Sequence, residues 1–296
     1  MIALYCLIVN KRSGNGRGFK TWLQVKKTLD EQNIPYCVHF TEPEQDALFI
    51  QNLMCQRRFT AIIVIGGDGT IHEVAAGLIG TKTPLGIIPA GSGNDFSRGL
   101  GIPLNHEKAL RRILTGKPKI IDIGYVNATP FCSVAAIGFG EVAEAANTSK
   151  RKKWLNVLHL GKVSYMIHAL NILARYKPMD MTLTIDRKPY HFKKVWFVAI
   201  ANLPYYAGGL RICPHASSND GLFDICIVRG ISKWALLRLF PLVFNGAHVS
   251  SSAIEIIRGR ELNISSPAPL LIHGDGEIID QNPAQLRIKP HTLYVI

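Results

Sequence analysis

A glycine-rich loop with one carboxylate is the clearest candidate for chemistry, Ile65-Gly66-Gly67-Asp68-Gly69-Thr70-Ile71-His72-Glu73. It follows an apolar, β-branched run and opens a helical pattern, so it should join a buried strand to a helix. The glycines allow a tight turn, and a helix N-terminus attracts phosphate. The pattern favours Thr70 as N-cap with Glu73 closing a capping box. Because Asp68 would repel a phosphate unless a cation lay between them, the loop also predicts Mg²⁺; a plain strand-to-helix turn is the alternative.

Two more loops of small residues are expected beside this one. Ser13-Gly14-Asn15-Gly16-Arg17-Gly18 follows the first apolar run, and Gly91-Ser92-Gly93-Asn94-Asp95 follows the fourth. Because parallel strands open onto one crevice at their C-terminal ends, the three loops should converge there. The first loop lacks the third glycine of G-x-G-x-x-G, and the sequence contains no G-x-x-x-x-G-K-[ST]. Dinucleotide-dependent redox chemistry and P-loop ATPase chemistry are therefore disfavoured.

Two Asp-Gly pairs in the second half of the chain are the next candidates. Asp220-Gly221 precedes an apolar run, and Asp275-Gly276 lies between two strand-like runs. Each could be a simple hairpin turn, because Asp-Gly is a common turn signal. Asp275 and Glu277 are two residues apart, however, so an extended segment would turn both carboxylates to one face. Paired carboxylates there would be suited to taking a proton from a hydroxyl.

The elements that position these residues differ between the two parts of the chain. Strands are expected at 2–9, 36–41, 61–65 and 85–89, with helices around 19–29, 42–57, 70–78 and 105–114. Strands that are apolar throughout are typical of a parallel sheet covered on both faces, so residues 1–123 are predicted to form a doubly wound α/β domain. Short strands then dominate, with helical stretches at 154–176 and 233–244. Residues 124–296 are predicted to form a β-rich, mainly antiparallel domain.

Composition and charge narrow the class of protein. Of 296 residues, 47% are hydrophobic and 19% charged, which excludes disorder as the main state. No apolar run approaches the roughly 18–20 residues of a membrane-spanning helix, and the start is expected to be a strand and not a signal peptide. Six scattered cysteines without a C-x-x-C pair indicate buried thiols in a reducing compartment.

The formal net charge of +13 predicts an anionic partner, whether nucleotide, nucleic acid or membrane surface. The basic run at 150–153 lies beside an aromatic helical stretch, and residues 233–244 are apolar and aromatic with two basic residues. This pattern is one way to dock on an anionic membrane, although a solvated charge run on an ordinary core helix is equally compatible with it.

Five segments together suggest a family. They are Asn10-Lys11-Arg12-Ser13-Gly14, Gly66-Gly67-Asp68-Gly69-Thr70, Gly91-Ser92-Gly93-Asn94-Asp95-Phe96, Asp220-Gly221-Leu222-Phe223-Asp224 and Asp275-Gly276-Glu277. The set resembles the soluble lipid kinases of the diacylglycerol kinase/sphingosine kinase catalytic family, bacterial branch, over essentially the whole chain. The second segment alone is shared with NAD kinases and phosphofructokinase-like folds. The resemblance implies an α/β nucleotide-binding domain, a β-sandwich-like second domain whose last strand could return to the first, and an ATP–Mg²⁺ site between them.

The resemblance also implies site residues. ATP would be contacted by Asn10, Lys11, Arg12, Ser13, Gly14, Thr41, Gly67, Asp68, Gly69, Thr70, Ile71, His72, Glu73 and Ser92. Glu277, with Asp275, would accept the proton of a lipid hydroxyl, and which of the two takes it is open. Asp68 would act with them through Mg²⁺. A structural Mg²⁺ would be held by Asp220 and the carbonyls of Ser217 and Leu222. His72 stands where the family usually has Asn, and Ser92 where Thr is common, so the effect of His72 on nucleotide contacts is open.

The expected function is transfer of the γ-phosphate of ATP to the hydroxyl of a lipid alcohol, with diacylglycerol as acceptor and phosphatidic acid as product. The protein would be cytoplasmic and peripheral to the inner face of the membrane, where it meets its lipid, without a nucleic-acid partner; a homodimer is compatible with the sequence. Two alternatives remain: a soluble-metabolite kinase of the NAD kinase type, and a catalytically weak lipid- or nucleic-acid-binding protein, which the charge of +13 keeps open.

Overall fold

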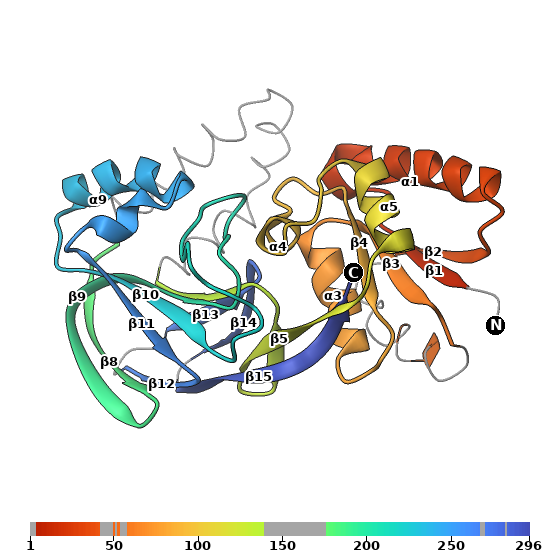
Figure 1. Cartoon of the computed structure of the whole chain (residues 1–296). Coiled ribbons are helices and arrows are strands. Elements are labelled where there is room, and N and C mark those ends of the chain that lie inside the picture. Colours follow the sequence, from red (N-terminus) through yellow and green to blue (C-terminus); the bar gives the residue numbers. More distant parts are fainter. Residues whose placement is uncertain are drawn as a thin grey trace.

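A computed structural model describes residues 4–41, 50, 52–53, 58–138, 176–266, 270–281 and 283–296. Most of the helices expected at 42–57 and 154–176, and the whole basic run at 150–153, lie outside these residues. The described strands form one continuous sheet that is parallel in its first part and antiparallel in its second (Figure 1). The α/β fold with a β-rich second part, predicted from the sequence, is confirmed.

The first part is a parallel sheet in the order β4-β3-β1-β2. Its strands are β1 (Tyr5–Val9), β2 (Tyr36–Phe40), β3 (Ala61–Gly66) and β4 (Leu85–Pro89), and its helices are α1 (Ser13–Glu31), α3 (Asp68–Leu78), α4 (Asp95–Gly99) and α5 (His106–Thr115). Strands β1, β3 and β4 are buried throughout, as a sheet between two helical layers requires. On α1, Trp22, Val25 and Leu29 share one buried face, because residues three, four and seven apart lie on the same side of a helix.

The second part is built from antiparallel strands. Some of them alternate buried and exposed residues, as β12 does with Leu262 and Ile264 inside and Asn263 outside, whereas β7 is buried throughout. Its strands are β5 (Lys119–Val126), β6 (Thr129–Phe131), β7 (Val134–Ile137), β8 (Met179–Ile185), β9 (Lys188–Ala201), β10 (Phe223–Arg229), β11 (Ile254–Gly259), β12 (Glu261–Ser265), β13 (Leu271–Gly274), β14 (Glu277–Gln281) and β15 (Ala284–Val295). The helical stretch expected at 233–244 is α9 (Lys233–Leu239) followed by the 3-10 helix η1 (Phe240–Phe244); a second 3-10 helix, η2, spans Ala247–Ser250.

Strand β15 belongs to both parts. It pairs antiparallel with β12 and β5, and at its end Val295 pairs in parallel with Leu85 of β4. Leu293, Val295 and Ile296 are buried in the same apolar cluster as the parallel strands. The two parts therefore share a core at this point, and the boundary near residue 123 stays a prediction.

Candidate functional site

Three loops meet at the C-terminal edge of the parallel strands, as the strand order predicts. A Cβ atom on Gly91 would lie 2.5 Å from the Cα of Gly67, and one on Gly14 would lie 2.2 Å from the carbonyl oxygen of Ala90. Backbone this close tolerates only glycine at those positions. The glycines therefore serve to bring three backbone segments together, which leaves their N–H groups gathered at one edge of the sheet.

Asn10 ties the first loop to helix α3. Its Nδ2 donates to Thr70 Oγ1 at 2.9 Å, and its Oδ1 accepts from the backbone N–H groups of Arg12 and Ser13. Thr70 is buried, and α3 begins at Asp68 with Gly67 as N-cap, so the prediction that Thr70 caps the helix is wrong. Thr70 lies inside the first turn of α3 and not ahead of it, and its hydroxyl hydrogen-bonds with Asn10 instead of capping the helix.

The residues predicted to contact ATP all lie at this edge or on the first turns of α3. Asn10 to Gly14 follow β1, where residues 14–16 have left-handed φ angles of 58° to 86°, so regular helix begins only after Gly16. Thr41 follows β2, with its N–H donating to Val9 O at 3.1 Å, and Ser92 is exposed after β4. Those after β3 are Gly67, Asp68, Gly69, Thr70, Ile71, His72 and Glu73, of which Thr70 and Ile71 are buried. Contact of the whole set with nucleotide stays a prediction.

Two carboxylates border the loops without an ion-pair partner among the described residues. Asp68 Oδ1 accepts from Phe96 N at 3.1 Å, and Asp95 Oδ2 accepts from Gly208 N at 2.7 Å, whereas the buried Asp95 Oδ1 has no hydrogen-bond partner there. Both carboxylates lie against the backbone of Gly93. Burial raises the pKa of both groups, that of Asp95 to about 6, and the neighbouring charge of Asp68 adds to the shift at Asp95. Two uncompensated acids with a free buried oxygen form a donor set suited to Mg²⁺.

Asp275, in contrast, is fully engaged. Its carboxylate accepts from Cys132 N and Ser133 N at 2.7 Å each and contacts His72 Nδ1 at 2.8 Å, and its side chain is only 7% exposed. Asp275 has a left-handed φ of 52° in the tight turn between β13 and β14, so the expected extended segment is wrong. The carboxylate of Asp275 turns inward, while Glu277 begins β14 and is exposed. The two carboxylates are therefore not an equivalent pair.

His72 links the loop side of the site to the turn between β13 and β14. It lies on α3, and its Nδ1 contacts Asp275, which is 203 residues away along the chain. Burial alone would lower the pKa of His72. The hydrogen bond to Asp275 and the negative charges of Asp275, Glu277 and Glu73 outweigh burial, so the pKa of His72 is raised. The imidazolium form is thus favoured next to the loops that are predicted to hold a triphosphate.

The predicted structural metal site carries its own positive charge. Asp220 pairs with the guanidinium of Arg258, which also contacts Asp224 Oδ1 at 3.1 Å, and the other Asp220 oxygen accepts from Leu222 N. Ser217 Oγ donates to Asn219, and Asp122 accepts from Gly221 N and His291 N near by. In this structure Arg258 therefore supplies the positive charge beside Asp220. Mg²⁺ at Ser217, Asp220 and Leu222 stays an untested prediction, and no step below depends on it.

Comparison with known proteins gives one family over nearly the whole chain. Residues 5–126 match the diacylglycerol kinase catalytic domain, and residues 135–296 match the YegS C-terminal NAD kinase beta sandwich-like domain. The chain is 30% identical over 295 residues to a diacylglycerol kinase of Mycobacterium tuberculosis, covering 98% of this chain and 93% of that protein. A diacylglycerol kinase of Bacillus subtilis is 29% identical over 275 residues, covering 92% and 88%. The chain belongs to this family of lipid kinases.

The structural comparison agrees with this lipid kinase assignment at the level of fold. A crystal structure of a diacylglycerol kinase from Bacillus anthracis superposes with a TM-score of 0.75 at 20% identity, covering 100% of this chain and 96% of that one. As a kinase of this family the protein uses ATP. Within the part of the chain that the structure describes, no helix has the length and apolarity to cross a bilayer.

Sequence reasoning missed two groups that matter in the structure of this kinase. Asp95 was seen only as the end of a small-residue loop, although an acid after such a loop carries the same signal as Asp68. Asp122 was not singled out, because it sits in an apolar strand with no motif around it. The partners that reveal its role, the N–H groups of Gly221 and His291, are 99 and 169 residues away along the chain.

Proposed function

We propose that this lipid kinase transfers the γ-phosphate of ATP to the hydroxyl of diacylglycerol, giving phosphatidic acid. The observation that supports this function best is a contrast between the acids of one site. Asp68 and Asp95, which have no ion pair among the described residues, face the glycine loops. The exposed Glu277 lies on the turn that Asp275 holds to α3. The relatives named diacylglycerol kinase support this acceptor.

The triphosphate would lie on the gathered loops. Backbone N–H groups at the start of α3, together with those of the first loop, suit phosphate oxygens, since eleven residues of helix direct their dipole at this edge. The cationic form of His72 would add positive charge beside the terminal phosphate. Phosphoryl transfer depends mainly on such positioning and charge compensation, so rigid backbone contacts between the loops are what the reaction requires.

Mg²⁺ would be held by Asp68 and Asp95. The free buried oxygen of Asp95 supports this, and neither acid forms an ion pair with a described residue, although the charge of Arg98 partly offsets the raised pKa of Asp95. When bound, the ion would supply positive charge to the phosphate oxygens. The part of the protein itself is to hold the two carboxylates in place, through Phe96 N for Asp68 and Gly208 N for Asp95.

Glu277 is our choice for the proton acceptor. Its carboxylate is exposed, whereas Asp275 already accepts backbone hydrogen bonds and contacts His72. In the proposed step the acceptor oxygen attacks the γ-phosphorus, the bond between that phosphorus and the β,γ-bridging oxygen breaks, and ADP leaves. The hydroxyl proton passes to Glu277. Asp275 acts as a positioning residue that fixes the turn carrying Glu277.

A diacylglycerol acceptor would be met at a membrane surface. The formal net charge of +13 would favour contact with the anionic cytoplasmic leaflet, because basic residues near such a surface are attracted within roughly one Debye length, about 8 Å at physiological salt. We therefore propose a peripheral association on the inner face of the membrane.

Radiolabelled ATP incubated with the protein, Mg²⁺ and a panel of acceptors tests this function. The panel would hold diacylglycerol, monoacylglycerol, sphingosine and NAD, and products would be separated by thin-layer chromatography. Label that comigrates with phosphatidic acid is expected, and an Asp68→Asn preparation serves as the control for contaminating kinases. Label in another lipid would replace the acceptor, and label in NAD or in no acceptor would overturn the proposal.

A further inference from the structure

Helix α9 and η1 form a layer outside the sandwich in which Leu236, Leu237 and Val243 pack against the apolar cluster beneath, while Trp234 and Leu242 are exposed. Neither element contains a buried residue. Trp234 is 77% exposed, the largest exposure among the exposed large apolar side chains of the described residues, and Leu242 is 40% exposed. A tryptophan this exposed costs free energy in water, and clusters of this kind in a folded protein usually mark an interaction site.

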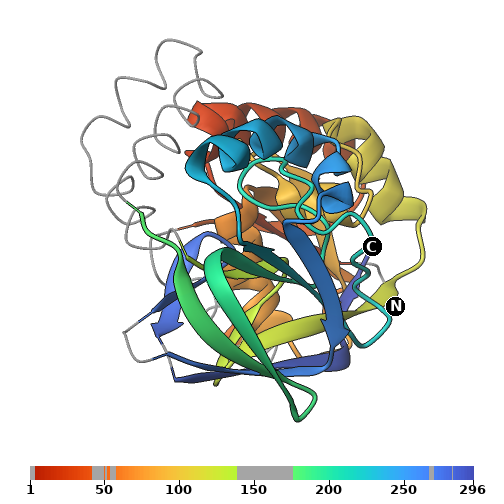
Figure 2. The same ribbon diagram turned by 90° about the vertical axis from the view of Figure 1, so that its left-hand side faces the viewer.

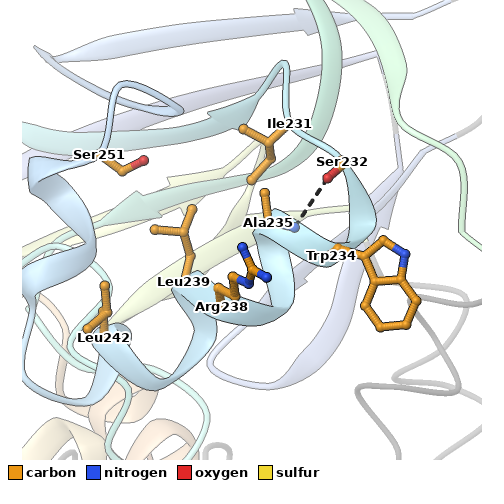
Figure 3. A pocket seen from close by; sticks show the side chains of 8 residues that line it. All are labelled: Ile231, Ser232, Trp234, Ala235, Arg238, Leu239, Leu242 and Ser251. Atoms are coloured by element: carbon orange, nitrogen blue, oxygen red, sulfur yellow. Dashed lines mark hydrogen bonds between the residues drawn. The ribbon is translucent and has the colours of Figure 1, made fainter.

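A cavity of about 550 Å³ lies along this layer (Figure 3). Trp234, Arg238 and Leu242 are spaced by four residues, so they follow one side of α9 and η1, with Arg238 between the other two. The cavity is lined by Ile231, Ser232, Trp234, Ala235, Arg238, Leu239, Leu242 and Ser251. It thus combines one cationic group and two hydroxyls with an apolar wall.

The charged side chains of the segment that contains α9 and η1 are all basic. Residues 230–254 contain no Asp or Glu, but include Lys233 and Arg238. Arg238 makes no ion pair with any residue that the structure describes, whereas Arg229 and Arg258 are paired with acids. An exposed guanidinium without an ion pair among the described residues, beside apolar side chains in an open cavity, is complementary to a phosphate attached to an apolar body.

The layer faces the same way as the site. Helices α9 and α1 lie along the same upper side of the molecule, at its left and right in Figure 1 and one in front of the other in Figure 2. Val243 of η1 accepts a hydrogen bond from Arg211 N at 2.9 Å, and the adjoining segment closes on itself through Tyr206 and Leu210. Within that segment Gly208 N bonds Asp95. A planar surface touching α9 would therefore lie on the side toward which the loop edge opens.

We infer that the α9–η1 cavity binds anionic phospholipid at a membrane surface. Arg238 with Ser232 or Ser251 would take the headgroup phosphate, Trp234 would sit at headgroup depth, and Leu239 and Leu242 would contact acyl chains. This inference rests on the proposed lipid kinase function, and it adds the surface by which the kinase meets its acceptor.

Vesicle sedimentation tests the inference. The protein should sediment with vesicles that mix phosphatidylcholine and phosphatidylglycerol, less with pure phosphatidylcholine, and less at higher salt. Because one basic residue near an anionic surface changes partitioning about fivefold, Arg238→Gln should weaken binding by about that factor, and Trp234→Ala by at least as much. Matched controls are Arg260→Gln for charge and Leu104→Ala for exposed apolar surface, both away from the cavity; equal losses in these controls would overturn the inference.

Tryptophan fluorescence gives a second measurement. Of the four tryptophans, Trp22 and Trp196 are buried and Trp154 lies outside the described residues, so the measurement uses a Trp154→Phe background, in which a blue shift on adding the mixed vesicles should come mainly from Trp234. The shift should fall sharply in Trp234→Phe, which keeps apolar surface and so tests insertion without a large change in affinity. A shift that is unchanged in Trp234→Phe would place the membrane contact elsewhere and overturn the inference.

Kinase assays separate this inference from the proposed function. With dioctanoylglycerol dispersed in detergent, Trp234→Ala and Arg238→Gln should keep the wild-type rate, whereas with diacylglycerol in mixed vesicles they should raise the apparent KM about fivefold or more. Loss of phosphorylation in every format, including the wild type, would contradict the function and not the surface. Vesicle binding that is unaffected by both variants, or a protein dimer that dissociates in Trp234→Ala, would assign α9 to another partner and overturn the inference.

Discussion

The acids on the two sides of the site are held in different ways. On the loop side, Asp68 and Asp95 accept from backbone N–H groups, repel one another and lack an ion-pair partner among the described residues, and one buried oxygen of Asp95 stays without a hydrogen bond. On the sandwich side, Asp275 accepts two backbone hydrogen bonds of 2.7 Å and contacts His72. The first pair is buried at a cost in free energy, while the second arrangement stabilises the fold.

This difference separates Asp68 and Asp95, which are available to a ligand, from Asp275, which stabilises the fold. A buried acid with a free oxygen and no ion pair is available to a ligand such as a metal ion, whereas an acid whose two oxygens already accept hydrogen bonds is a weaker proton acceptor. The contrast predicts loss of activity for changes on the loop side and loss of stability for changes at Asp275.

The largest expected effect is that of Asp68→Asn. The amide keeps the shape and can still accept from Phe96 N, but removes the negative charge that would hold Mg²⁺. We expect turnover to fall by at least about 10³-fold with an unchanged circular dichroism spectrum, since charge compensation dominates phosphoryl transfer. A folded variant that phosphorylates lipid at near the wild-type rate would remove Asp68 from the mechanism.

Glu277→Gln should come next, with a fall of about 10²-fold in kcat and little change in KM for ATP, because a proton acceptor acts only in the transition state. Its side chain is exposed, so the melting temperature should not move. Asp275→Asn is the matched test of the alternative acceptor. Retained activity in Glu277→Gln would transfer the role to another group.

Asp275→Asn should act mainly on stability. An amide cannot accept from both backbone N–H groups and keep the charge-assisted contact with His72. We expect the free energy of unfolding to fall by about 2–3 kcal/mol, measured by urea titration. If stability were unchanged while turnover collapsed, the carboxylate would be chemical and the distinction between the two sides would fail.

Asp95→Asn should do the reverse, raising stability while it lowers activity. A carboxyl group whose pKa is raised to about 6 in the fold stabilises it at low pH, and that stabilisation is lost as the pH rises through 6. The variant should therefore be more stable than the wild type by about 1–2 kcal/mol above pH 6 and about equal to it near pH 4. Thermal melts across this pH range, without Mg²⁺, provide the measurement, and a variant less stable at neutral pH would contradict it.

The smallest effect is expected for His72→Asn, the substitution that the family resemblance of the sequence suggests. Because the pKa of His72 is raised, its ion pair with Asp275 stabilises the fold fully below about pH 6.5 and less as the pH rises through the raised value. The variant should be less stable by up to about 1 kcal/mol near pH 6, and the difference should shrink near pH 9. A difference that grows with pH would show that the neutral imidazole makes the contact.

The loop side was largely predictable from sequence, and the sandwich side was not. Glycine spacing after successive apolar strands is local information, so it placed Gly14, Gly67 and Gly91 at one edge before any coordinates. Asp275-Gly276 carried two local interpretations, a turn and an extended pair, and the positive φ of Asp275 decided for the turn. Its bond to His72 spans 203 residues, a long-range contact that no local pattern encodes.

The end of β15 affects how the protein can be made. Leu293, Val295 and Ile296 complete the apolar cluster of the parallel strands, yet about 200 residues follow β4 before a ribosome adds them, roughly 10–40 s at ordinary rates of synthesis. During that time the edge of β4 lacks the backbone partner that Ile296 N–H and Val295 later supply to Leu85. Final closure of the first domain must therefore wait for the last residues, and a nascent chain halted earlier would present an open strand edge to chaperones or to other chains.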